Sequence, residues 1–267
     1  MIKRQDFYKR IFGYQETSQI ENRVIEKAVE KAKAQYAGRK AFSIEDLTDF
    51  WKISGISLRD EAYAVNLSKT LSPSKTQDEH AEQRILAEKA HDFYTPSFPE
   101  LYAIISCLEQ NKDNQKYQDE ITNVRAFIKD SALKTWLMTL TRIQYNPQGE
   151  DIVIHNYKQP SQYELPVHFI GPDGAILSAN HAEKPVQALL DTKQSLQEVN
   201  EAFRWLMDVD AYIWRLNSKP QQTDERVAGF VAYSRGVSLS CGRDSHNPYS
   251  ALRVSLLPAG PKKIMVE

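Results

Sequence analysis

The stretch VAYSRGVSLSCGRDSHNPYSALRV, residues 231–254, decides the class of fold that this sequence predicts. Residues 237–241 and 252–256 alternate apolar and small or polar side chains, and a polar loop, residues 242–250, separates them. Alternation with a period of two predicts β-strands. In the first strand it places Val237, Leu239 and Cys241 on one side, and Ser238 and Ser240 on the other. Because helical patterns dominate earlier and short strands end the chain, the sequence predicts an α+β fold.

Helical signals are spread over residues 1 to about 90. Residues 18–38 keep small and apolar side chains on one face. Ser43 with Asp46 resembles a weak capping box, and Thr76 with Glu79 forms a stronger one. Aromatic residues and prolines gather just after residue 90, which predicts a domain boundary there. We therefore expect an all-α amino-terminal segment, residues 1–90, and a second domain, residues 91–267.

The second domain has well-marked helix starts and strands. Ser97 and Glu100 form a capping box around Pro99, which predicts a helix, and a second helix is expected at about residues 116–133. Residues 134–145 and 151–157 predict a hairpin around the turn NPQGE. Ser195 and Glu198 begin a further helix, after which only strands are expected.

Composition limits the classes of function. The 34 Lys and Arg residues balance 35 Asp and Glu residues, so no overall field favours nucleic acid or an anionic membrane. No apolar run approaches the roughly 20 residues that span a bilayer, and the first residues lack the apolar core of a signal peptide. We expect a cytoplasmic protein that does not bind membranes. Cys107 and Cys241 suit neither a disulfide framework nor a metal site, and we expect both in the core.

Catalysis and cofactors find little support. Asp244, Ser245 and His246 are the residue types of a hydrolytic triad, but consecutive residues rarely converge as a triad requires. A hydrolase is therefore a minor alternative, which loss of turnover in His246→Ala would support. The six histidines show no metal-ligand spacing, and the 10 glycines form no phosphate-binding loop. We expect no catalytic residue, no metal and no cofactor.

DNA binding is the main alternative. Residues 42–69 could form a helix-turn-helix with SGIS, residues 54–57, as its turn. Asp60 and Glu61 would then lie where phosphates approach, which is unfavourable, so nucleic acid is not the favoured partner. The alternative function is a regulatory protein with a DNA- or partner-binding helical amino terminus and a ligand-sensing second domain.

The tail has an unusual composition. Residues 227–258 contain no Lys, Gln, Glu, Met or Trp, although Lys, Glu and Gln are frequent elsewhere. Its polar positions hold Tyr, Ser, Arg, Asp, His and Asn. Such short or rigid side chains lose little entropy on contact and are typical of antibody combining sites. The tail therefore predicts a binding surface.

Three segments carry a resemblance to a known fold family. The ending SCGRDSHNPYSALRV, residues 240–254, resembles the closing strand pair of C-type-lectin-like domains of the formylglycine-generating-enzyme type. Residues 94–105 are similar to the start of the first helix of that fold, and residues 135–157 resemble its core strand after the second helix. The resemblance covers about residues 91–258 and implies short antiparallel strands with two or three helices. The sequence lacks the sugar-binding motifs of calcium-type lectins and the cysteine pair of the formylglycine-generating enzymes.

Within that fold, the tail resembles the variable proteins of diversity-generating retroelements. In that family, copying errors at template adenines randomise Asn codons, which cannot then encode Lys, Gln, Glu, Met or Trp. The ending ALRV departs from the more typical Gly-Phe-Arg. The resemblance implies a non-enzymatic protein that binds a protein or other macromolecular ligand through a diversified region, residues 227–258. The implied ligand-contacting positions are Tyr233, Arg235, Ser238, Ser240, Arg243, Asp244, His246, Asn247 and Tyr249.

Overall fold

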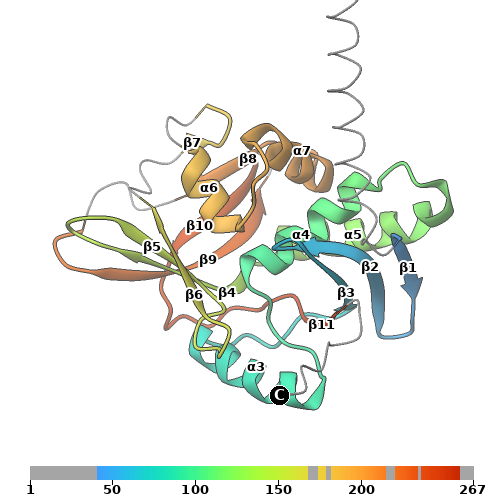
Figure 1. Ribbon diagram of the computed structural model, residues 1–267, viewed down its shortest axis with the longest axis horizontal. Coiled ribbons are helices and arrows are strands. Elements are labelled where there is room, and N and C mark those ends of the chain that lie inside the picture. Colours follow the sequence, from blue (N-terminus) through green and yellow to red (C-terminus); the bar gives the residue numbers. More distant parts are fainter. Residues whose placement is uncertain (1–40, 168–173, 179–181, 215–219, 234–235, 259–267) are drawn as a thin grey trace, which may run out of the picture. The chain divides into compact units, whose positions relative to one another are not determined.

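A computed structural model describes residues 41–167, 174–178, 182–214, 220–233 and 236–258 (Figure 1). The described residues from Ala41 onward belong to one compact unit, so the boundary predicted near residue 90 falls inside it. The helix predicted over residues 18–38 lies outside the described residues. Five α-helices and two β-sheets occur in the described part of the chain, which confirms the α+β class.

The elements divide into a small sheet, a large sheet and the helices. The small sheet has the order β1-β2-β3-β11, and all its neighbours are antiparallel. The large sheet has the order β6-β5-β4-β9-β10-β8-β7. The strands are β1 (Ser43–Asp46), β2 (Phe50–Leu58), β3 (Glu61–Ser68), β4 (Leu137–Tyr145), β5 (Asp151–His155), β6 (Tyr163–Val167), β7 (Gly174–Ala175), β8 (Ala211–Trp214), β9 (Asp224–Tyr233), β10 (Gly236–Arg243) and β11 (Val254–Pro258). The helices are α3 (Gln77–Ala90), α4 (Phe98–Gln110), α5 (Gln118–Lys134), α6 (Glu183–Leu190) and α7 (Leu196–Met207), with a 3₁₀ turn at Gln115–Tyr117.

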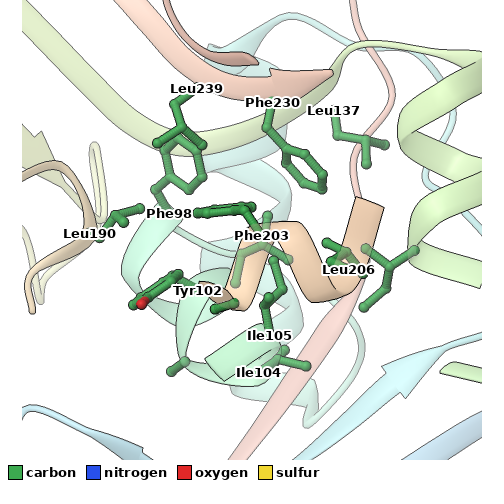
Figure 2. Close-up of a cluster of buried hydrophobic side chains, with 14 of the residues drawn as sticks. Phe98, Tyr102, Ile104, Ile105, Leu137, Leu190, Phe203, Leu206, Phe230 and Leu239 are labelled. Carbon is green, nitrogen blue, oxygen red and sulfur yellow. The ribbon is translucent and has the colours of Figure 1, made fainter. Parts of the chain in front are cut away.

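The central helix α4 lies between the two sheets (Figure 1). Its predicted start is confirmed: Ser97 and Glu100 form the capping box, and Pro99 lies in the first turn. Figure 2 shows Phe98 on the side of the large sheet, where its ring stacks with that of Phe230, and Tyr102 further from the sheet, where its ring stacks with that of Phe203 of α7. Because eleven of its thirteen residues are buried, α4 anchors one continuous core.

The other helix starts and the hairpin were also predicted correctly. Helix α3 begins with the Thr76–Glu79 capping box and α7 with the Ser195–Glu198 box. Helix α5 matches the expected second helix, and β4 pairs with β5 as an antiparallel hairpin. Cys107 and Cys241 are buried, as predicted.

The prediction of helices over residues 41–70 is wrong, because this segment forms β1, β2 and β3. Trp51 and Ile53 are buried and alternate with the more exposed Lys52, which is the two-residue period of a strand. Arg59 and Asp60 adopt positive φ angles of 52° and 64° and form a two-residue hairpin turn between β2 and β3. Residues 42–69 therefore form no helix-turn-helix.

The strands of the tail also differ from the expectation. The last two, β10 and β11, do not form a pair with each other, because β10 lies in the large sheet and β11 pairs with β3. One pair, β8 with β10, is parallel rather than antiparallel. The second domain was expected to have two or three helices, and α6 is an additional one. No Ser, Thr, Asp or Asn caps it, since its N-cap is Ala182, so the sequence carries no start signal.

Candidate functional site

The main chain of the polar loop, residues 242–250, is fixed by backbone hydrogen bonds to distant segments. The Tyr249 N–H donates to the Lys75 carbonyl at 2.9 Å, and the Lys75 N–H donates to the Tyr249 carbonyl at 3.0 Å. The Met138 N–H donates to the Ser250 carbonyl at 2.9 Å. Such bonds depend on backbone atoms, so they hold the loop in place whatever side chains it carries.

A buried histidine adds a further support for this loop. His80 Nε2 lies 2.9 Å from the Tyr249 carbonyl oxygen, and its Nδ1 lies 2.8 Å from the Thr95 hydroxyl. Burial lowers the pKa of His80, so the ring is neutral at pH 7. A neutral ring with its proton on Nε2 donates to Tyr249 and accepts from Thr95, which satisfies both ring nitrogens.

Five side chains of the loop are exposed: Arg243, Asp244, His246, Asn247 and Pro248. Asp244 Oδ1 accepts the His246 N–H at 2.8 Å and lies 3.0 Å from His246 Nδ1. The backbone bond, followed by the side-chain contact, lowers the pKa of Asp244. The carboxylate is therefore charged at pH 7 and also stabilises the turn that presents its neighbours.

Tyr249 is half-buried, and its ring lies 4.5 Å from the ring of Trp136. The Arg243 guanidinium lies 5.8 Å from the Tyr249 ring centroid and 5.9 Å from that of Trp136. Trp136 is buried with Met138, and a small apolar cluster forms around them on the large sheet. Tyr249 therefore supports the loop as well as bordering its surface. Sequence reasoning missed Trp136, because it lies before β4 and carries no local signal of contact with the tail.

Ser238 and Ser240 are buried, with exposed fractions of 8% and 5%. Strand β10 has β9 on one side and β8 on the other, so its serines lie in the middle of the sheet. The exposure expected for these two ligand-contacting positions is not observed. They do not belong to the exposed surface of the loop.

Two aromatic residues are exposed on the same face of the sheet as these serines. Tyr233, which pairs with Gly236, is 55% exposed. Trp214, which pairs with Ser240, is 51% exposed and was not predicted. A half-exposed Trp is typical of binding surfaces. Trp214 was not predicted because it lies before residues 227–258, the segment whose composition indicated a binding surface. The predicted position Arg235 lies outside the described residues.

A cavity of about 320 Å³ adjoins the loop. Sequence analysis did not predict it, because its walls come from segments far apart in the chain. The loop supplies three lining residues, and α3, β4 and β9 supply the other five. The lining residues are Asp78, Arg142, Asp224, Glu225, Arg226, Asp244, Ser245 and His246.

The geometry does not assemble a hydrolytic triad. Asp244 and His246 are in contact, but within the part of the chain that the structure describes Ser245 donates no side-chain hydrogen bond to His246. A nucleophile needs such a bond to a base. Among the same described residues, no group of three His, Cys, Asp or Glu side chains is arranged to hold a metal ion. None of the helices described here is long and apolar enough to cross a membrane.

Comparison with known proteins gives no family assignment. No family model, curated protein or solved structure matches this chain significantly.

Proposed function

We propose that this protein is a non-enzymatic binding protein that contacts a protein or other macromolecular ligand through the loop surface, defined as Arg243, Asp244, His246, Asn247 and Tyr249. The observation that carries the proposal is the combination of exposed side chains with a main chain held by hydrogen bonds to Lys75 and Met138. A preorganised loop loses little further entropy on binding.

The chemistry of the loop surface supports binding as well. Tyr and Arg are the residue types that most often dominate binding energy, and Tyr249 and Arg243 lie together against Trp136. Asp244 supplies a charged acceptor that can form a charge-assisted hydrogen bond. Tyr233 is exposed at the end of β9 that lies away from the loop, since it pairs with Gly236 whereas Arg243 pairs with Val227, so it is not part of the loop surface.

The finer proposal is that the domain is C-type-lectin-like and that residues 227–258 are diversified, as in the variable proteins of diversity-generating retroelements. The missing residue types in this segment support it. The same segment also supplies core residues such as Leu239 and Cys241, so only the exposed positions are free to change without loss of packing.

The diversification is tested by sequencing the genomic DNA around the gene. We expect a near copy of the segment that encodes residues 227–258, differing only at adenines, beside a reverse transcriptase gene. Absence of such a repeat would refute the diversification and leave the binding proposal to be judged on the protein alone.

Binding is tested with two displayed libraries of the full chain. One randomises the loop surface, and the matched control randomises residues 45–49, which are exposed and form the end of β1 and the turn to β2. Selection against a panel of purified proteins should give specific, well-folded binders from the first library and few from the second. Equal success of both libraries, or no binder from the loop surface, would overturn the proposal.

A further inference from the structure

The cavity beside the loop surface has one wall from the loop and one from the rest of the fold. Asp244, Ser245 and His246 form the loop wall. Asp78 lies at the start of α3, Arg142 on β4, and residues 224–226 at the start of β9. Its volume of about 320 Å³ is at the lower end for small-ligand sites, which suits one side chain of a larger ligand.

The two guanidinium groups of the cavity are already engaged. Arg142 donates through Nε to Gln77 at 2.8 Å, through Nη1 to Glu225 at 2.7 Å, and through Nη2 to Asp78 at 3.3 Å. Arg226 donates through Nε to Asp224 at 2.9 Å, and its Nη2 lies 2.8 Å from the same oxygen. An anionic ligand would have to displace these carboxylates, so the cavity is poorly suited to phosphate or a carboxylate.

The carboxylates keep an excess of acceptor capacity. The cavity is lined by four carboxylates and by two cations, Arg142 and Arg226. A third cation, Lys158, lies 3.0 Å from Asp78 just outside the lining. These four carboxylates and three cations, Arg142, Arg226 and Lys158, leave one negative charge uncompensated. Within the described residues, Asp244 is the lining carboxylate that forms no ion pair with a Lys or Arg side chain. A ligand that brings N–H donors and a positive charge complements this arrangement.

We propose that this cavity receives the cationic side chain, Arg or Lys, of the ligand and that Asp244 is the residue that selects for it. The inference rests on the proposed binding function and names the chemistry of one part of the ligand. The wall made by α3, β4 and β9 fixes the shape of the cavity, and residues 244–246 set its preference. A substitution at position 244 therefore changes which side chain is accepted.

The test uses small probes on the full chain, so it needs no identified ligand. N-acetyl-arginine amide, N-acetyl-lysine amide, N-acetyl-glutamate amide and inorganic phosphate are titrated while backbone amide shifts of residues 224–226 and 244–246 are followed by NMR. The two cationic probes should give saturable shifts at these residues, and their affinity should fall as salt rises. The affinity should drop at least threefold in Asp244→Asn, which can still accept the His246 N–H.

The control variant is Asp49→Asn, which makes the same change of charge at an exposed position beside the small sheet. It should bind the cationic probes as the parent chain does. Equal affinity of the two variants, stronger binding of phosphate or glutamate, or no saturable shift with the cationic probes would each overturn the inference. Binders from the loop-surface library would still support the proposed function in that case, whereas failure of that library would leave the probe result unaffected.

Discussion

Substitution of Gly229 by alanine should destabilise the fold strongly, because β9 has no room for a side chain there. An added Cβ would lie 2.7 Å from Trp136 Cζ2 and 2.9 Å from Cη2, and nearer still to the Leu137 carbonyl oxygen. Both neighbours are held in place: Leu137 begins β4, and buried Trp136 supports Tyr249. Relief of the overlap must therefore move a backbone strand or the support of the loop.

The expected cost is at the upper end for overpacked cores, about 3 kcal/mol. In a unit of this size each kcal/mol lowers the melting temperature by about 2–4 °C, so Gly229→Ala should melt about 6–12 °C below the parent protein. Thermal unfolding followed by circular dichroism, with urea unfolding as a second measurement, gives both quantities.

Gly242→Ala is the matched control, since Gly242 lies on the neighbouring strand β10. A Cβ at Gly242 would meet Trp214 at 3.6 Å, an ordinary contact distance, and the melting temperature should stay within about 2 °C of the parent. If Gly229→Ala melts together with Gly242→Ala, the close packing of Trp136 on β9 is refuted.

Three further predictions concern ion pairs, pH and the loop. Glu100→Gln should cost about 3 kcal/mol in urea unfolding, because the buried guanidinium of Arg84 then keeps only Glu88 as an anionic partner. The double variant Arg84→Met with Glu100→Gln, which keeps an acceptor for the Ser97 N–H, should regain most of the loss, and equal losses of the single and double variants would contradict this. Burial lowers the pKa of His155 from 6.5 to about 4, so the unfolded chain binds the proton more readily and the unfolding free energy should fall by about 3 kcal/mol as pH drops through that window. The same pH series on His155→Gln should show a smaller fall, and an unchanged slope would exclude His155 as its cause. Arg243→Ala should leave the melting temperature within about 2 °C, whereas Tyr249→Ala should cost about 1 kcal/mol through its lost contact with Trp136, and the reverse order would mean that the loop is packed differently.

The sequence predicted those elements whose signals are local. Ser97 with Glu100 and Ser195 with Glu198 each start a helix through contacts within one turn, and both helices form where expected. Strands β1 to β3 were missed because the acidic residues of residues 43–49 imitate a helix start. Whether residues 43–68 form strands depends on partners far along the chain, since β3 pairs with β11. A local stretch of sequence does not contain both strands, so it cannot show that they pair.

The candidate site divides in the same way. The alternating pattern of β10 correctly placed Leu239 and Ser240 on opposite faces of the strand. A period of two does not show whether the second face is covered by other parts of the protein. Whether the second face is covered depends on distant neighbours, and Ser240 is buried beside Gly229 and Trp214. The cavity could not be predicted for the same reason, because Arg142 and Asp244 meet only in the folded chain.

Most exposed side chains of the loop play no part in holding its main chain in place. The side chain at position 244 is the exception, because it does both. Arg243 and Asn247 contribute no side-chain hydrogen bond to the loop within the described residues, so many side chains can replace them. Asp244 accepts the His246 N–H and also lines the cavity. Only Asp, Asn and, more weakly, Ser and Thr make that turn-stabilising bond. If residues 227–258 are diversified, functional variants should therefore favour these four residues at position 244, and the choice among them would change the charge of the cavity without disturbing the turn.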